Sequence, residues 1–152
     1  ATSGRRCLEC QGRIPDATQL RGPTFAENRL IQGAVNAAYE AVIRLSPRGP
    51  SGQAREIDAV IDTGYNGFLT LPPAIVEELD LPFQSHGRAT LADGSEVAFA
   101  VWGVTVLWDG QARFVEADEA DATPLASMLL LDSHSLYVES TEGGRVVIQV
   151  ME

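Results

Sequence analysis

The sequence of 152 residues contains no lysine, because all eleven of its basic residues are arginine. This absence excludes the lysine that contacts phosphate in P-loop proteins and in protein kinases. It also excludes every mechanism in which a lysine forms a Schiff base. Aspartate and glutamate number 21, which gives a formal net charge of −10. Since phosphate binding requires a basic face, this balance argues against a nucleic-acid partner.

Long apolar runs are missing as well. No segment approaches the roughly 20 apolar residues that are needed to span a bilayer, and the start of the sequence carries no apolar block typical of a signal peptide. We therefore expect a cytoplasmic protein with no membrane partner. Hydrophobic residues make up 45% of the sequence, which is enough for one globular domain with its own core.

Cysteine and histidine are scarce. Cys7 and Cys10 form one C-x-x-C, and a zinc site would need two more ligands. His86 and His134 lie far along the sequence in segments that are interpreted as separate elements, and no strand and helix flank Cys7 as a redox motif would require. We predict no metal and no cofactor. Residues 1–29 are interpreted as a poorly ordered N-terminal extension or remnant, and residues 30–152 as the single domain.

Alternation of apolar and polar residues predicts a β-rich fold with one short helix. The helix is expected to begin at Pro72-Pro73 and to end at Pro82. Many short strands suggest a closed or nearly closed β-structure. The expected strands are 35–45, 55–62, 67–71, 88–91, 96–102, 104–108, 111–116, 136–139 and 145–150.

Two further segments carry local signals. Asp93-Gly94 stands between alternating segments, which predicts a β-hairpin with its tip near Asp93. The acidic run from Glu116 to Asp121 is expected to be a solvated loop, because its apolar side chains are all alanine.

The tripeptide Asp62-Thr63-Gly64 is the strongest chemical signal in the sequence. It follows an apolar strand, which would hold a carboxylate rigidly at the rim of a hydrophobic core. Thr63 offers a hydroxyl that could lock the turn, and Gly64 would allow another backbone to approach closely. Two such carboxylates placed close together share one proton and can activate water. Because the sequence has a single D-T-G, a two-carboxylate site would require a homodimer.

The segment from Ala59 to Pro72, AVIDTGYNGFLTLP, resembles the active-site segment of small prokaryotic retropepsin-like aspartic proteases, which are single-domain relatives of the retroviral enzymes. The resemblance extends from about Ile31 to the C-terminus. It implies a closed six-stranded acid-protease barrel, an obligate homodimer and hydrolysis of peptide bonds. It also implies that Asp62, Thr63 and Gly64 are catalytic and that Ala92, Asp93 and Gly94 form a substrate-binding flap. Ser127 stands where the family has a glycine that packs against the catalytic turn.

Two functions remain open from the sequence. The first is an aspartic endopeptidase, a hydrolase that cleaves peptide or protein substrates with one Asp62 from each chain of a homodimer. The second is a weakly active or inactive dimeric module that keeps the acid-protease fold to bind peptides or protein partners.

Overall fold

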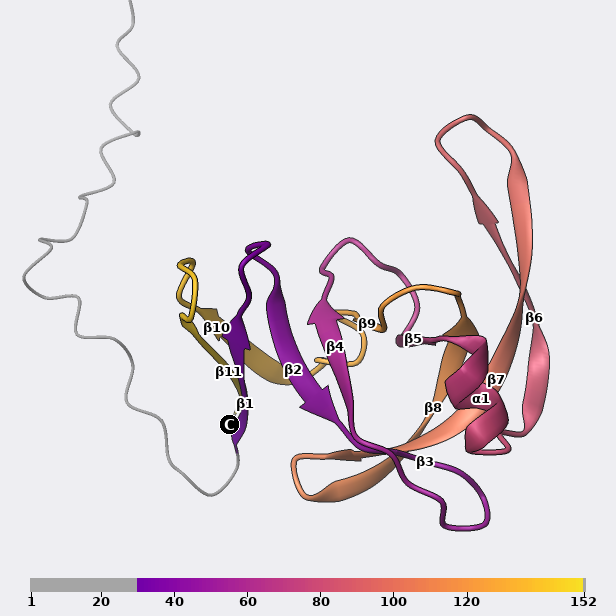
Figure 1. Cartoon of the computed structure of the whole chain (residues 1–152), viewed down its shortest axis with the longest axis horizontal. Helices are drawn as coiled ribbons and strands as arrows, with labels where there is room; N and C mark the ends of the chain where they lie inside the picture. The colour runs from indigo at the N-terminus through magenta and orange to yellow at the C-terminus, as the bar shows by residue number, and fades with distance from the viewer. Residues whose placement is uncertain (1–29, 152) are drawn as a thin grey trace, which may run out of the picture.

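The computed structural model describes residues 30–151, so the predictions for Cys7, Cys10 and residues 1–29 lie outside the described residues. In Figure 1 the strands lie in two groups, and the short helix and a long projecting hairpin belong to one of them. In chain order the elements are β1 (Leu30–Val35), β2 (Ala41–Leu45), β3 (Pro47–Arg48), β4 (Ile57–Ile61), β5 (Leu69–Leu71), α1 (Pro73–Glu78), β6 (Phe83–Thr90), β7 (Glu96–Trp108), β8 (Gln111–Glu119), β9 (Leu125–Ala126), β10 (His134–Val138) and β11 (Arg145–Val150).

The strands form one mixed sheet in the order β10-β11-β1-β2-β4-β9-β5-β8-β7-β3, with β6 added beside β7. The prediction of a mostly β fold with one short helix is confirmed. A closed six-stranded barrel is not confirmed, because the sheet has eleven strands and its end strands, β10 and β3, do not pair. Closure depends on a consistent stagger between strands, and the number of strands in a sequence does not determine that stagger.

The predicted strand over residues 35–45 is wrong, since two antiparallel strands, β1 and β2, are separated by a turn. The Asn36 side-chain oxygen accepts hydrogen bonds from the backbone N–H groups of Ala38 (3.0 Å) and Glu40 (2.9 Å). Tyr39 adopts a left-handed conformation with φ of 60°. Local hydrogen bonds of this kind replace ladder hydrogen bonds and reverse the chain.

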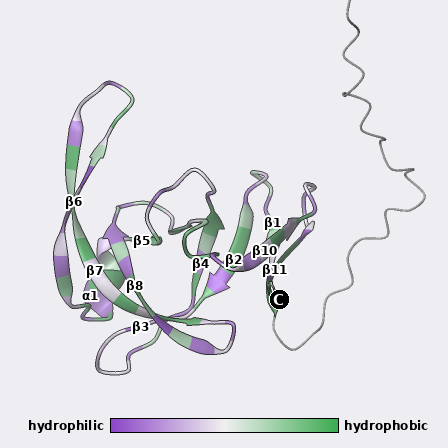
Figure 2. Cartoon of the chain, turned by 180° about the vertical axis from the view of Figure 1, so that it is seen from behind, coloured by the Kyte–Doolittle hydropathy of each residue, from purple (hydrophilic) through white to green (hydrophobic). Residues whose placement is uncertain are grey.

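The core is a single cluster of buried side chains from α1 and from strands along the whole sheet, from β11 and β1 to β8 and β7. Figure 2 shows apolar residues along β4, β7 and β11, which contribute to this core. The predicted helix is confirmed but is shorter than expected, because the chain turns at Leu79 and Asp80, and Asp80 has a φ of 50°. No helix within the described residues is long and apolar enough to cross a membrane. The largest fully buried apolar side chains are Trp108, Ile43, Leu69, Leu71, Leu79, Leu130 and Ile148.

The predicted hairpin is confirmed, and its arms are longer than expected. β7 is one strand of 13 residues, where the sequence suggested two, and it pairs with β6 on one side and β8 on the other. The expected solvated loop at 116–121 is wrong, because residues 116–119 belong to β8. Ala117 is fully buried between Leu69 and Trp102 of the neighbouring strands, where a small side chain is what the packing allows.

Candidate active site

Asp62 lies directly after β4, in a turn that is fixed by hydrogen bonds of both its backbone and its side chain. The Asp62 N–H donates to the carbonyl of Ala126 (2.9 Å). The Asp62 carboxylate accepts from the N–H of Gly64 (3.0 Å), and its carbonyl accepts from the N–H of Tyr65 (3.3 Å). Asp62 itself stays partly exposed. The turn therefore presents the carboxylate to solvent from a fixed backbone.

Thr63 and Gly64 behave differently from what the sequence suggested, at least within one chain. Thr63 is exposed, and its hydroxyl makes no hydrogen bond to residues 30–151. A Cβ on Gly64 would meet only the Asp62 carboxylate, at an ordinary 3.5 Å, so no other backbone of the described chain approaches it closely. The Asp62 carboxylate, not the Thr63 hydroxyl, closes this turn.

The short strand β9 ties this turn to the rest of the site. β9 runs parallel to β4, with Val60 opposite Leu125 and Ile61 opposite Ala126. Ala126 is also paired with Leu69 of β5. The backbone after Asp62 and the backbone after β9 are thus held side by side by hydrogen bonds between segments more than 50 residues apart in sequence.

Ser127 occupies the position next to the turn where the resemblance predicts glycine. It is fully buried, and its hydroxyl donates to the carbonyl of Gly67 and lies 3.1 Å from the carbonyl of Phe68. The same oxygen accepts from the N–H groups of Leu129 (3.2 Å) and Leu130 (3.3 Å). The hydroxyl has one hydrogen to donate, so the serine satisfies one carbonyl and two N–H groups, in a place where glycine could satisfy none with its side chain.

Tyr65 connects the loop after Asp62 to strand β8. Its hydroxyl donates to the carboxylate of Asp118 on β8 and lies 3.4 Å from the carbonyl of Leu69. A Cβ on Gly67 would meet the Tyr65 hydroxyl and come within 2.6 Å of the Asp118 carboxylate, so a larger residue at this position would have to displace the Tyr65–Asp118 pair. Burial, the hydrogen bond to Asp118 and its negative charge together raise the pKa of the Tyr65 hydroxyl far above its usual value.

Sequence reasoning missed Asp118 because it lies in the acidic run that was expected to be a solvated loop. A signal was present: Val115 and Ala117 alternate with Glu116 and Asp118, which fits a strand with small buried residues. The resemblance singles out Ser127, but no sequence signal indicates that its hydroxyl bonds three backbone groups.

The predicted flap residues lie at the tip of the β6–β7 hairpin. Gly94 has a φ of 85°, and the Asp93 carboxylate accepts from the N–H (2.9 Å) and the hydroxyl (2.5 Å) of Ser95. The hydrogen bonds from the Ser95 side chain and backbone lower the pKa of the Asp93 carboxyl. Ala92, Asp93 and Gly94 are all exposed, and no hydrogen bond or ion pair within residues 30–151 joins them to Asp62. The described chain alone does not bring the flap and the candidate carboxylate together (Figure 1).

The two histidines lie apart from this site, His86 on the exposed β6 and His134 on β10. Across the residues that the structure describes, no three His, Cys, Asp or Glu side chains are grouped as a metal site would require.

Among solved structures, the chain is similar to the crystal structure of a retropepsin-like aspartic protease from Rickettsia conorii. The alignment covers 80% of this chain and 90% of that one, with a TM-score of 0.53 and 13% sequence identity. The two chains share a fold. No protein-family model matches the sequence, and no curated protein matches it. At this identity the similarity shows the acid-protease fold alone.

Proposed function

We propose that this protein is an aspartic endopeptidase whose active site forms when Asp62 of two identical chains meet across a two-fold axis. The observation that carries the proposal is the fixed turn of Asp62, which ends an apolar strand in a chain with the fold of a retropepsin-like aspartic protease. One hydrogen bond to the carboxylate and two to the backbone of Asp62 hold this residue in place, and Asp62 stays partly exposed. A general acid or base needs this combination of fixed position and access.

The proposed reaction requires two carboxylates that share one proton. The ionised Asp62 takes a proton from a water molecule, whose oxygen attacks the peptide carbonyl carbon. The protonated Asp62 of the second chain donates its proton to the carbonyl oxygen, which gives a tetrahedral diol. Collapse of the diol returns a proton to the leaving nitrogen and breaks the C–N bond. Two carboxyl groups held close together cannot both ionise easily, so the pair keeps one proton.

Exposed apolar side chains beside the turn support the homodimer. Met128 and Leu129 directly follow the buried Ser127, and they are 60% and 45% exposed. Ser127 is bonded to the loop that follows Asp62, so these side chains lie on the segment that borders the candidate carboxylate. Apolar side chains exposed next to a site that needs a second carboxylate fit a surface covered by a second chain.

The proposal is tested by peptide cleavage with the wild type and the Asp62→Asn variant. We expect Asn to lower cleavage by at least about 10²- to 10⁴-fold, the usual contribution of a general acid or base, while the mass in solution remains that of a dimer. Asp121→Asn is the matched control, since Asp121 is exposed and lies outside the site. Equal cleavage by wild type and Asp62→Asn would refute the role of Asp62.

A dimer that binds peptides but cleaves none between pH 4 and 8 would favour the second function, a binding module with the acid-protease fold. A wild-type protein that is monomeric throughout would remove the physical basis of the two-carboxylate site.

A further inference from the structure

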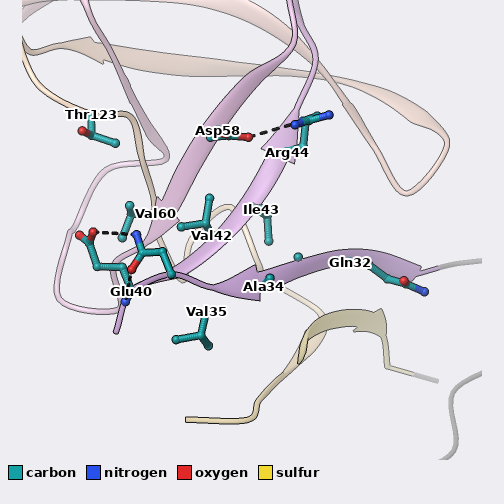
Figure 3. Close-up of a pocket in the computed structure, with 12 residues that line it drawn as sticks. Gln32, Ala34, Val35, Glu40, Val42, Ile43, Arg44, Asp58, Val60 and Thr123 are labelled. Atoms are coloured by element: carbon teal, nitrogen blue, oxygen red, sulfur yellow. Dashed lines mark hydrogen bonds and ion pairs between the residues drawn. The ribbon is translucent and has the colours of Figure 1, made fainter. Parts of the chain in front are cut away.

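A cavity of about 680 Å³ lies on the face of β1, β2 and β4. Three apolar side chains form a row across its floor, because Ala34 pairs with Val42 and Val42 pairs with Val60. Polar side chains line the remaining wall, as Figure 3 shows. They include Gln32, Asn36, Glu40, Arg44, Asp58 and Thr123.

The cavity is continuous with the segments that hold Asp62. Val60 lies in β4, and Asp62 directly follows this strand. The Val60 N–H donates to the carbonyl of Pro124 (2.9 Å), the residue after Thr123. The Asp62 N–H donates to Ala126 of the same segment. One pair of backbone segments therefore builds both the cavity floor and the catalytic turn.

The charges in the cavity are not evenly matched. Arg44 forms ion pairs with Asp58 (3.5 Å) and Glu56 (3.8 Å), so its charge is already compensated. Glu40 has only a neutral side-chain partner, the amide of Asn36 (3.0 Å), and no ion pair with any residue in 30–151. In Figure 3, Glu40 lies on the side of Val60 and Thr123, while the Arg44–Asp58 pair lies on the other side.

We propose that this cavity is a substrate subsite that takes an arginine or lysine side chain of the peptide, with the cationic head group at Glu40. The aliphatic stem of such a side chain would lie on Val42 and Val60, and its head would reach the exposed carboxylate. Residues 30–151 contain six arginines and seventeen aspartates and glutamates, and this excess of negative charge further favours a basic peptide. This inference rests on the proposed function, and it names the substrate class of that site.

The experiment uses the Asp62→Asn protein, so that binding is read without cleavage. The probes are acetylated and amidated octapeptides of alanine and leucine with one arginine moved along the sequence. Each is paired with an analogue that carries neutral, nearly isosteric citrulline in its place. At one position of the arginine we expect binding about tenfold tighter than for citrulline, measured by calorimetry. This is the scale of one charge-assisted hydrogen bond.

Glu40→Gln, added to Asp62→Asn, decides whether Glu40 is responsible. Glutamine keeps the oxygen that accepts from Asn36, so the turn is preserved while the charge is lost. We expect the preference for arginine to disappear in this variant and to persist in Glu116→Gln, which removes an exposed carboxylate on β8, outside the cavity lining. Equal binding of both peptides, absence of binding, or a preference that survives Glu40→Gln would overturn the subsite.

The two proposals fail separately. If the wild type cleaves peptides but shows no preference that depends on Glu40, the subsite is wrong and the protease stands. If binding depends on Glu40 while the wild type cleaves none of the peptides, the subsite stands and the protease is wrong.

Discussion

The turn that carries Asp62 and the hairpin tip that carries Asp93 are both short reversals next to β-strands, yet they are held in opposite ways. The Asp62 turn is bonded to distant segments through Ala126, Ser127 and Asp118. The tip around Asp93 is closed only by bonds among its own residues, such as those to Ser95. Its neighbours Leu91 and Val97 are exposed.

This difference separates two tasks that a protease needs. A catalytic carboxylate must be held to within a fraction of an ångström, which requires support from packed neighbours and second-layer hydrogen bonds. A segment that closes over a substrate must open at little cost, and segments with few buried contacts do so. We therefore expect substitutions near Asp62 to affect the whole fold and those near Asp93 to act locally.

The largest effect is expected for Leu69→Ala in β5, the strand after the Asp62 turn. Leu69 is fully buried, and removing such a side chain lowers the free energy of unfolding by about 2–5 kcal/mol. Val97→Ala in the hairpin is the matched variant, because Val97 is 44% exposed, and it should change this free energy by less than about 0.5 kcal/mol. Urea denaturation measures both, and similar losses would break the comparison.

The second-largest loss of stability is expected for Ser127→Ala. The variant leaves the Gly67 carbonyl and the Leu129 and Leu130 N–H groups without the hydroxyl, in a buried place. We expect unfolding to be easier by about 1–3 kcal/mol. Ser85→Ala in the exposed β6 removes a hydroxyl from the hairpin and should have almost no effect. A neutral Ser127→Ala would mean that the hydroxyl does not support the site.

Tyr65→Phe should have a smaller effect, about 1–2 kcal/mol, because it removes one hydrogen bond to a carboxylate at a half-buried position. It should also change the response to alkali. Folding raises the pKa of Tyr65, so its contribution is complete below about pH 10 and declines above it, where the unfolded tyrosine ionises.

Chemical denaturation followed from pH 8 to 12 measures this response. The loss of stability above pH 10 should be reduced in Tyr65→Phe and retained in Tyr39→Phe, since Tyr39 is 69% exposed. An unchanged alkaline slope in Tyr65→Phe would show that the Tyr65–Asp118 contact is not formed in solution.

The smallest effect is expected at the hairpin tip. Hydrogen bonds from Ser95 lower the pKa of Asp93, so the turn bonds are complete above the ordinary aspartate range near pH 4 and are lost as pH falls below it. The amide resonance of Ser95 should report this change by NMR. The denaturation midpoint of Asp93→Asn should equal that of the wild type at each pH. If Asp93→Asn keeps the acid response of Ser95, the assignment to this carboxylate is wrong.

Local sequence signals predicted the parts of the fold that depend on neighbouring residues. Pro72-Pro73 marked the start of α1, Asp93-Gly94 marked the hairpin, and the apolar run before Asp62 marked β4. The same kind of signal failed at 35–45, where alternation fits one long strand as well as two. Hydrogen bonds to the Asn36 side chain stabilise the turn that separates the two strands.

The supports of the candidate site could not be predicted in this way. β9 has two residues, and its position depends on partners in β4 and β5. Asp118 meets Tyr65 across 53 positions of sequence. No local pattern encodes such contacts, because they arise only when strands of fixed register are brought together.

The sequence alone determined the chemistry that is available: one D-T-G carboxylate, no lysine, and a β-rich chain with a net negative charge. Tertiary structure alone decided how that carboxylate is held and which buried hydroxyl supports its turn. It also decided that the sheet stays open. The physical reason is that residue types fix local conformation and charge, whereas burial and long-range hydrogen bonds depend on which strands become neighbours.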